Sequence, residues 1–439
     1  MAEQGETTMP RADGRIPFVL DRQELLARAV FVFIAALVTK DFFLARLLHV
    51  AGPGLNTAML VAFAAVAFSL GRMRPLWNRT HLLLLVSVVV FACANTIAVG
   101  NEYWRLTGAL YHTVQPAVIA ALFFCIDLPS EKIRKILKWI NVMILLGTLG
   151  AFVDNAFFSR VARPPALFLY GSWSFYAFPT YQTAWLSTNI CGTLYLYRVT
   201  RRKRYLLSAL FCMLAVVLAG RRKSFVSACL AFAAFMLLDN SWKKGLAKIV
   251  FCAGAGAAVL ATAGRSFLLR FLAVKSYVGT EGTDTQARTA LTLKCVDVAR
   301  DYFPWGSGLG TFASEPAATH YSQLYYSYGL SNVFGLEPYA GQPGHPTFLL
   351  DTWWPHIVGE FGFLGTLLFL ALWFHPLTRV LRLPKTEERK NVLFFVFSVW
   401  CMILLESTGS TYPEQLQFIA VYCGLCPMLL RQAGKEAEQ

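Results

Sequence analysis

Residues 81–99 of the chain read HLLLLVSVVVFACANTIAV. A run of this length without Asp, Glu, Lys or Arg can cross about 30 Å of hydrocarbon as a helix of about twenty residues. Lipid offers no hydrogen-bond partner to the backbone, so the run is stable there only as a helix. Further apolar runs predict spans at 28–48, 54–71, 108–127, 137–156, 179–198, 204–219, 224–239, 246–264, 353–375, 392–408 and 413–430.

The overall composition places the whole chain in the same class. Hydrophobic residues make up 56% of the 439 residues and charged residues 15%, whereas a soluble globular protein carries about 25% charged residues. We therefore expect an all-α polytopic membrane protein with about twelve transmembrane helices. The cysteines lie mostly inside apolar runs as small hydrophobic residues, and Cys423-x-x-Cys426 is interpreted as helix packing rather than a redox or metal pair.

The basic residues set the orientation. The formal net charge is +15, and most Lys and Arg lie between apolar runs, which is typical of lipid contact and not of nucleic-acid binding. With the N-terminus in the cytoplasm, 26 of the 40 basic residues fall on the cytoplasmic side. The predicted organisation is a cytoplasmic tail (1–27), nine spans (28–264), a large external loop (265–352), three spans (353–430) and a second cytoplasmic tail (431–439).

Most of the external basic residues gather in two segments. One is the turn Gly220-Arg221-Arg222-Lys223, and the other is the loop 265–352, which holds Arg265 and Arg288. Positive charge is normally kept on the cytoplasmic flank of membrane helices. Its concentration outside therefore predicts an anionic ligand at the external face.

The external loop contains one amphipathic stretch, from Thr285 to Tyr302. One face of this predicted helix holds Ala287, Leu291, Val298 and Tyr302. The stretch should end at Pro304 and the turn Gly306-Ser-Gly-Leu-Gly310. No strand precedes that turn, so it is interpreted as a place of close backbone approach and not as a nucleotide loop. The tyrosines that follow suit either sugar stacking or the bilayer interface: Tyr321, Tyr325, Tyr326 and Tyr328.

Three motifs occur in order along the external segments. They are Leu218-Ala-Gly-Arg-Arg222-Lys-Ser224, then Arg288 followed by Pro304 and Gly306-x-Gly-x-Gly-Thr-Phe312, then Asp351-Thr-Trp-Trp-Pro-His-Ile-Val-Gly-Glu360-Phe-Gly-Phe-Leu-Gly365. Together they resemble the O-antigen ligase and polymerase superfamily of bacterial inner-membrane glycosyltransferases. The resemblance follows the order of the whole chain, while its specific motifs lie between 218 and 366.

This resemblance implies a GT-C-like fold in the bacterial inner membrane, with the active site facing the periplasm and both termini in the cytoplasm. It implies a glycan donor carried on undecaprenyl diphosphate. The implied acceptor is another lipid-linked glycan or the lipid A core. Membrane lipids and a chain-length regulator are the implied partners, and no cofactor is expected.

The resemblance also assigns roles to the external cations. Departure of the lipid diphosphate builds negative charge, which guanidinium groups stabilise through paired N–H donors. Arg222 and Arg288 are the predicted diphosphate clamp. Arg221, Lys223 and Arg265 are the assisting candidates, although Arg221 and Lys223 would also suit anchoring of helix ends to lipid phosphates. The chain has no Asp-x-Asp pair, so metal-independent transfer is expected.

Three residues remain open as the general base, because the acceptor hydroxyl must lose a proton as it attacks. Where the ligase branch has His-Asn, this chain has Asp351, with His345 six residues before it and His356 five after it. Asp351 would also serve as a helix N-cap, and His345 as a structural loop residue. Glu360 either pairs between helices or supports the site.

The aspartate at that position favours one branch of the family. It resembles the polymerases of surface polysaccharide, either O-antigen or exopolysaccharide, more than the ligases that transfer glycan to lipid A core. A transporter or flippase of a lipid-linked anion is the alternative from another class. Transporters place charge near the bilayer midplane and contain paired repeats, whereas here charge gathers at one face and no repeat is visible.

Overall fold

The computed structural model of this chain describes residues 22–40, 53–70, 79–153, 179–219, 221–239, 243–245, 247–248, 250, 284–342, 345 and 347–438. Within these residues, helices coincide with every predicted apolar run except 246–264, which lies almost entirely outside them. These helices are α1 (Arg22–Lys40), α2 (Pro53–Ser69), α3 (Arg79–Val99), α4 (Tyr103–Cys125), α5 (Ser130–Val153), α6 (Pro179–Thr200), α7 (Lys203–Leu218), α8 (Arg222–Asp239), α14 (Trp354–Arg382), α15 (Glu387–Glu406), α16 (Leu416–Phe418) and α17 (Gly424–Glu438).

The described part of the chain contains six helical segments that are long and apolar enough to cross a membrane. This confirms the prediction of a helical, membrane-embedded protein. The helix at Leu55–Ser69 is apolar but shorter. The six segments are Arg79–Val99, Tyr103–Cys125, Ser130–Val153, Trp354–Arg382, Glu387–Gly409 and Leu416–Glu436.

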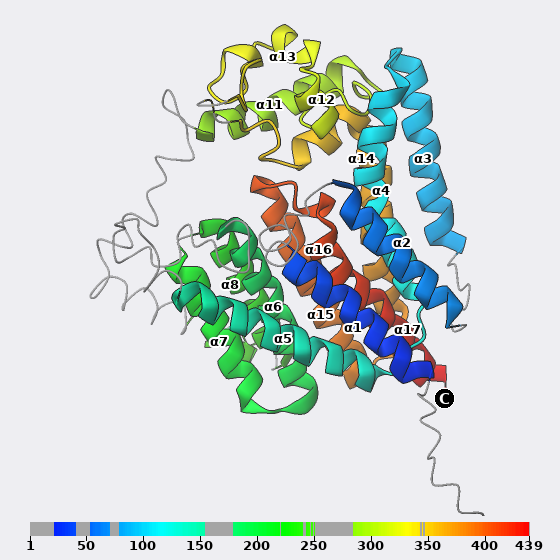
Figure 1. The fold of residues 1–439 in the computed structure, drawn as a ribbon, viewed down its shortest axis with the longest axis vertical. Helices are drawn as coiled ribbons and strands as arrows, with labels where there is room; N and C mark the ends of the chain where they lie inside the picture. The colour runs from blue at the N-terminus through cyan, green and yellow to red at the C-terminus, as the bar shows by residue number, and fades with distance from the viewer. Residues whose placement is uncertain are drawn as a thin grey trace, which may run out of the picture.

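A separate small domain, which we call the cap, lies at one end of the long helices (Figure 1). It comprises α11 (Asp284–Asp301), α12 (Glu315–Thr319), α13 (Gln323–Ser327) and the short helix η5 (Leu330–Asn332). Its buried side chains form a hydrophobic cluster of their own, distinct from the core of the long helices. The cap therefore packs around its own interior and is not a simple extension of the helical bundle.

The amphipathic helix predicted for the external loop is α11. Ala287, Leu291 and Val298 are fully buried in the cap core, as the helical period requires. Tyr302 was wrongly assigned to that face, and its side chain is 36% exposed. The helix ends at Asp301, so Tyr302 lies in the following turn and no longer points with the buried face.

Two of the four loop tyrosines belong to the interior of the cap. The Tyr325 side chain is fully buried, and its hydroxyl accepts a hydrogen bond from Ala313 N at 2.9 Å. The Tyr321 hydroxyl donates to Leu336 O at 2.6 Å. Tyr325 is therefore not placed for sugar stacking, whereas Tyr321 is half-buried and Tyr326 is 49% exposed.

The cap is fixed to α14 through the predicted glycine turn. The Gly306 backbone is in the left-handed region (φ +80°). A Cβ there would lie 2.2 Å from Gly362 N. Gly362 itself is non-helical (φ +63°) and kinks α14. Ser307 N and Gly308 N donate to the carbonyls that the kink exposes, those of Gly359 and Glu360, at 3.0 and 3.2 Å. The close backbone approach predicted for this turn is therefore made to another part of the chain.

Polar side chains from the α3–α4 hairpin hold the same turn from its other side. Asn95 Nδ2 donates to Glu360 O at 2.8 Å, and Asn101 Nδ2 donates to Leu309 O at 2.7 Å. Arg105 Nη1 donates to Gly310 O at 3.3 Å. Hydrogen bonds thus tie the cap to α3, α4 and α14. They fix the position of the cap residues relative to the ends of these helices.

The Cys423-x-x-Cys426 pair lies inside the C-terminal helical segment. Both side chains are fully buried and neither forms a disulfide. Cys423 belongs to a five-residue π-helical turn, and Cys426 to the first turn of α17. This confirms the interpretation that these cysteines pack between helices.

Candidate functional site

Arg288 and Asp351, two of the predicted site residues, form an ion pair beneath the cap. Arg288 lies on α11, which packs against α14, and its Nη2 atom is 2.5 Å from Asp351 Oδ2. Each side chain is about one-third exposed. Asp351 does not cap α14, because the N-cap position is Trp353 and no side chain bonds the helix start there. The capping role considered for Asp351 is therefore wrong.

Lys223 joins the start of α8 to the end of α15. Its Nζ atom donates to the carbonyls of Glu406 and Gly409 at 3.1 and 2.9 Å, and lies 3.5 Å from Glu406 Oε2. The Glu406 side chain is fully buried. In the structure Lys223 therefore joins the start of α8 to the end of α15 through protein groups.

The predicted cations are gathered in one place. Burial lowers the pKa of Lys223, Glu406 opposes this effect, and the positive charges of Arg288 and Arg221 lower that pKa further. Lys223 therefore lies within electrostatic range of both arginines. Arg222 is the first residue of α8, beside Lys223, and is partly exposed. Two segments far apart in sequence thus contribute to one basic cluster, formed by Arg221, Arg222, Lys223 and Arg288.

Two predicted residues do not join this cluster. Arg265 lies outside the described residues. His345 is exposed in the loop before α14, and its ring packs edge-on against Tyr339 at 4.8 Å between centroids. Its backbone carbonyl accepts from Gly341 N at 2.9 Å. These contacts favour the structural role that was the alternative for His345.

His356 is buried on the first turns of α14 and contacts carboxylates on both sides. Its Nδ1 atom is 2.9 Å from Glu360 Oε2, and its Nε2 atom is 3.9 Å from Glu414 Oε1. Nε2 also lies 3.2 Å from Thr113 Oγ1, whose own proton is donated to Ala109 O. Both ring nitrogens therefore face acceptors, an arrangement that favours the imidazolium form. We call His356, Glu360, Glu414 and Thr113 the His356 cluster.

Glu360 links this cluster to the cap. Its side chain is fully buried, and Oε1 accepts from Phe312 N at 2.8 Å and from Ser314 Oγ at 2.6 Å. Phe312 and Ser314 immediately follow the glycine turn. Glu360 therefore pairs α14 with the cap while its second oxygen orients His356.

Glu414 was not identified from the sequence. It lies on the short helix Tyr412–Glu414, and its side chain is 13% exposed. The predicted span 413–430 included Glu414, whereas the membrane-length segment of the structure begins at Leu416 and leaves Glu414 outside it. Burial raises the pKa of Glu414 to about 7; His356 opposes this shift, while the carboxylates of Glu360 and Glu315 add to it. A signal was present, because Glu406 and Glu414 are acidic residues beside or within apolar runs, where ionisable residues are usually functional.

The two clusters share one short connection, residues 407–415. Trp353 N donates to Ser407 O at 3.1 Å, which ties the segment before α14 to the end of α15. Gly409 O on this connection binds Lys223, and Glu414 lies five residues further on. A ligand held by the basic cluster would therefore be close to the connection that carries Glu414.

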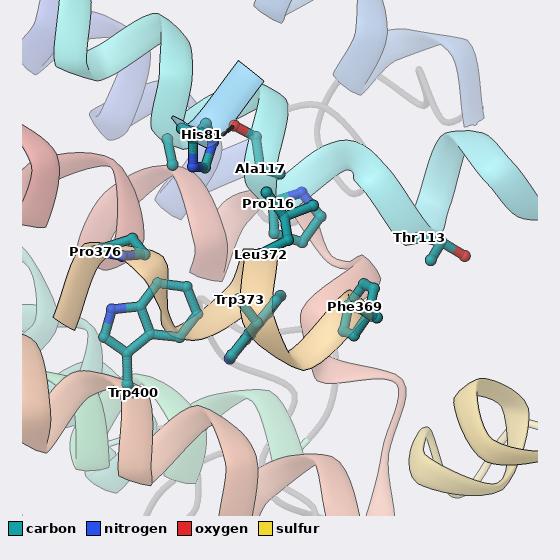
Figure 2. A pocket seen from close by; sticks show the side chains of 10 residues that line it. His81, Thr113, Pro116, Ala117, Phe369, Leu372, Trp373, Pro376 and Trp400 are labelled. Carbon is teal, nitrogen blue, oxygen red and sulfur yellow. Dashed lines mark hydrogen bonds between the residues drawn. The ribbon is translucent and has the colours of Figure 1, made fainter. Parts of the chain in front are cut away.

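A small apolar pocket lies between α3, α4, α14 and α15 (Figure 2). Thr113, which contacts His356, also lines this pocket, so the two features adjoin. His81 lines the end of the pocket opposite Thr113, and its Nε2 atom lies 3.3 Å from Ala117 O. The lining residues are His81, Thr113, Pro116, Ala117, Ala120, Phe369, Leu372, Trp373, Pro376 and Trp400.

Chemically, the arrangement offers fixed positive charge, buried carboxylates beside an imidazole, and an apolar pocket. Among the described residues, no group of three or more His, Cys, Asp or Glu side chains is arranged to hold a metal ion. No protein-family model matches the chain, and no curated protein matches it either.

Proposed function

We propose that this protein is an integral-membrane glycosyltransferase of the O-antigen ligase and polymerase superfamily. It takes a glycan from undecaprenyl diphosphate and polymerises the repeat units of a surface polysaccharide. The observation that carries the proposal is the basic cluster. Arg222 and Lys223 at the start of α8 lie near Arg288, which pairs with Asp351 before α14. A fixed set of cations beneath a cap suits a ligand with concentrated negative charge.

The proposal includes a topology. Twelve spans place the cap in the periplasm and both termini in the cytoplasm of a bacterial inner membrane. The loop between α6 and α7 lies at the end of the bundle away from the cap and carries Arg201, Arg202, Lys203 and Arg204 (Figure 1). Such clusters mark the cytoplasmic side. The basic cluster beneath the cap is then external, where the lipid-linked donor is presented.

Arg288 has a partner that a diphosphate can replace. The Asp351 carboxylate holds the Arg288 guanidinium at 2.5 Å. A diphosphate offers the same kind of oxygen acceptor with more negative charge. Donor binding would therefore exchange one ion pair for another, and the arginine would stabilise the leaving group as its bond to the sugar breaks.

We propose that a short segment of the donor's hydrocarbon chain contacts this apolar pocket. It is lined by aromatic and aliphatic side chains within four long helices and adjoins the His356 cluster at Thr113. Each buried methylene of a prenyl chain contributes about 0.8 kcal/mol. A soluble sugar nucleotide has no group that would use this pocket, whereas a polyprenyl diphosphate does.

The direct test is glycan transfer by the purified protein in nanodiscs. The donor is an undecaprenyl-diphosphate repeat unit, offered with a second lipid-linked repeat unit and, separately, with lipid A core. Longer lipid-linked chains are the expected product. Transfer only to lipid A core would instead establish ligation, and absence of transfer to either acceptor would contradict the proposed function.

A further inference from the structure

The His356 cluster forms a row of three ionisable groups that ends at the protein surface. Glu360 is 0% exposed, His356 is 1% exposed, and Glu414 is 13% exposed. Only the last member of the row is therefore open to a substrate. We propose that Glu414 accepts the proton of the acceptor hydroxyl, and that His356, oriented by Glu360, is its positioning residue. This inference rests on the proposed glycosyl transfer.

The geometry gives each member of the row a distinct task. Phe312 N and Ser314 Oγ hold one oxygen of Glu360, so its other oxygen stays against His356 Nδ1 at 2.9 Å. His356 Nε2 is then directed to Thr113 at 3.2 Å and toward Glu414 at 3.9 Å. At 3.9 Å the imidazole attracts the carboxylate without a full hydrogen bond, which leaves the Glu414 oxygens able to accept a proton.

The other candidate bases are less well placed. Asp351 is held by Arg288 at 2.5 Å, and His345 is exposed and packs against Tyr339. His356 itself has 1% exposure and acceptors at both nitrogens. Glu414 is the carboxylate among these four described residues that is partly exposed and whose nearest cationic partner, His356, lies beyond hydrogen-bond distance at 3.9 Å.

The proposed step balances in protons and electrons. The acceptor hydroxyl oxygen forms a bond to the anomeric carbon while its proton passes to the Glu414 carboxylate. The bond from the anomeric carbon to the diphosphate oxygen breaks, and its electron pair leaves with the lipid diphosphate, where the arginines stabilise it. The protonated Glu414 then releases its proton to water.

The charges around Glu414 predict how this step responds to pH. His356 and Glu360 face it from α14, Glu315 from α12, and Glu315 in turn pairs with His112 of α4 at 3.4 Å. On α15, Glu406 is engaged by Lys223. Because the pKa of Glu414 is raised to about 7, its basic form predominates above that pH. Turnover should therefore fall as the pH drops through about 7.

Three substitutions test the assignment. Two of them should shift, in opposite directions, the pH below which turnover falls (the acid limb of the pH profile), and the third should remove the base. Glu315→Gln removes a negative charge that raises the pKa of Glu414, so the limb should move to lower pH. His356→Gln removes a positive charge that lowers this pKa, so the limb should move to higher pH. Glu414→Gln should lower turnover by about 100-fold or more, as for other general bases, with donor binding unchanged.

Glu315 is the informative position if a buried variant fails to fold, because its side chain is 59% exposed. Glu387→Gln is the matched control, since that residue is 74% exposed at the other end of the bundle. It should leave both turnover and pH profile unchanged. Donor binding is measured separately, by tryptophan quenching with undecaprenyl diphosphate.

Wild-type activity separates this inference from the proposed function. If the wild-type protein transfers glycan and Glu414→Gln transfers it equally well, the assignment of Glu414 is wrong while the glycosyltransferase proposal stands. The assignment of Glu414 would also be wrong if Asp351→Asn abolished the fall in turnover at low pH while Glu315→Gln did not shift it. If the wild-type protein transfers nothing from any lipid diphosphate, the proposed function itself fails.

Discussion

Arg288 shows how one side chain can hold two successive partners. Its guanidinium contacts Asp351 in the structure and is proposed to contact the diphosphate during transfer. Lysine retains the positive charge but lacks the fork of two parallel donors. We predict that Arg288→Lys and Arg222→Lys each lose about 2–4 kcal/mol of transition-state stabilisation, measured as kcat/KM for glycan transfer.

The matched control for Arg288→Lys is Arg300→Lys on the same helix. Arg300 is 69% exposed and pairs with Asp297 at 2.9 Å, away from the basic cluster. It should keep full activity. An Arg288→Lys protein that matched the Arg300→Lys protein in kcat/KM would exclude the clamp role for Arg288.

Glycine positions in the cap offer a second residue-scale prediction. Gly306 and Gly329 both have left-handed backbone, at φ +80° and +70°, but a Cβ at Gly306 would meet backbone at 2.2 Å while one at Gly329 meets nothing within 4 Å. Gly329→Ala should cost about 1–2 kcal/mol for the backbone conformation alone. Gly306→Ala should add at least about 1–3 kcal/mol of steric strain and loosen the cap.

Apparent melting temperatures in one detergent and at one scan rate measure this difference, because unfolding of such proteins is often irreversible. The Gly306→Ala protein should melt well below the Gly329→Ala protein. Equal melting temperatures would show that the cap does not rely on close packing between Gly306 and Gly362.

The sequence singled out individual residues by their chemistry, as for Arg222 and Arg288, whose proposed role stays a prediction. Asp351, His356 and Glu360 were also identified, but their contacts were not, because Arg288 and Asp351 meet only after α11 packs on α14. Glu414 was missed for the same reason. Its neighbours come from α4, α12 and α14, and no local spacing in the sequence brings those segments together.

Among the elements, α4 and α14 line the apolar pocket and allow its proposed role to be tested. Ala120 lines the pocket, whereas Val118 on the same helix is 43% exposed on the outer surface. We predict that Ala120→Trp lowers kcat/KM for an undecaprenyl donor about tenfold, since displacing two methylenes costs about 1.6 kcal/mol. Val118→Trp should have little effect.

A donor with a short, water-soluble prenyl chain distinguishes loss of chain binding from general damage. Ala120→Trp should use this donor as well as the wild-type protein does. If Ala120→Trp fails equally with both donors, or leaves the long-chain donor unaffected, the pocket does not hold the prenyl chain.

Element prediction succeeded where periodicity was strong. The apolar runs and the amphipathic period of α11 reflect burial along one continuous helix, which sequence records directly. The kink of α14 at Gly362 was not predicted, because its cause is the cap turn that packs against it from residues 305–310. The five-residue helices α12 and α13 are too short to show a period.

At the scale of the whole molecule, the proposed topology is tested by thiol labelling. Gln323→Cys places an exposed thiol in the cap, and Lys203→Cys places one at the start of α7, beside the basic turn Arg201-Arg202. With the cap in the periplasm, an impermeant reagent added to intact spheroplasts should label the first and not the second. The native cysteines of the described part are buried or half-buried, which keeps the background low.

Permeabilised cells provide the control, in which both introduced cysteines should react. Labelling of Lys203→Cys in intact spheroplasts, or equal labelling of both variants, would contradict the orientation. It would also remove the basic cluster from the side of the membrane where the lipid-linked donor is presented.

The measurement that tests the central claim most directly is transfer by purified protein in nanodiscs containing EDTA. The donor is undecaprenyl-diphosphate glycan, with no nucleotide sugar and no ATP. The account predicts lipid-linked polymer whose new linkage is inverted relative to the donor, because one base and one diphosphate leaving group act in a single displacement. A strict requirement for Mg²⁺, retention of the donor configuration, or no product from this donor would contradict it.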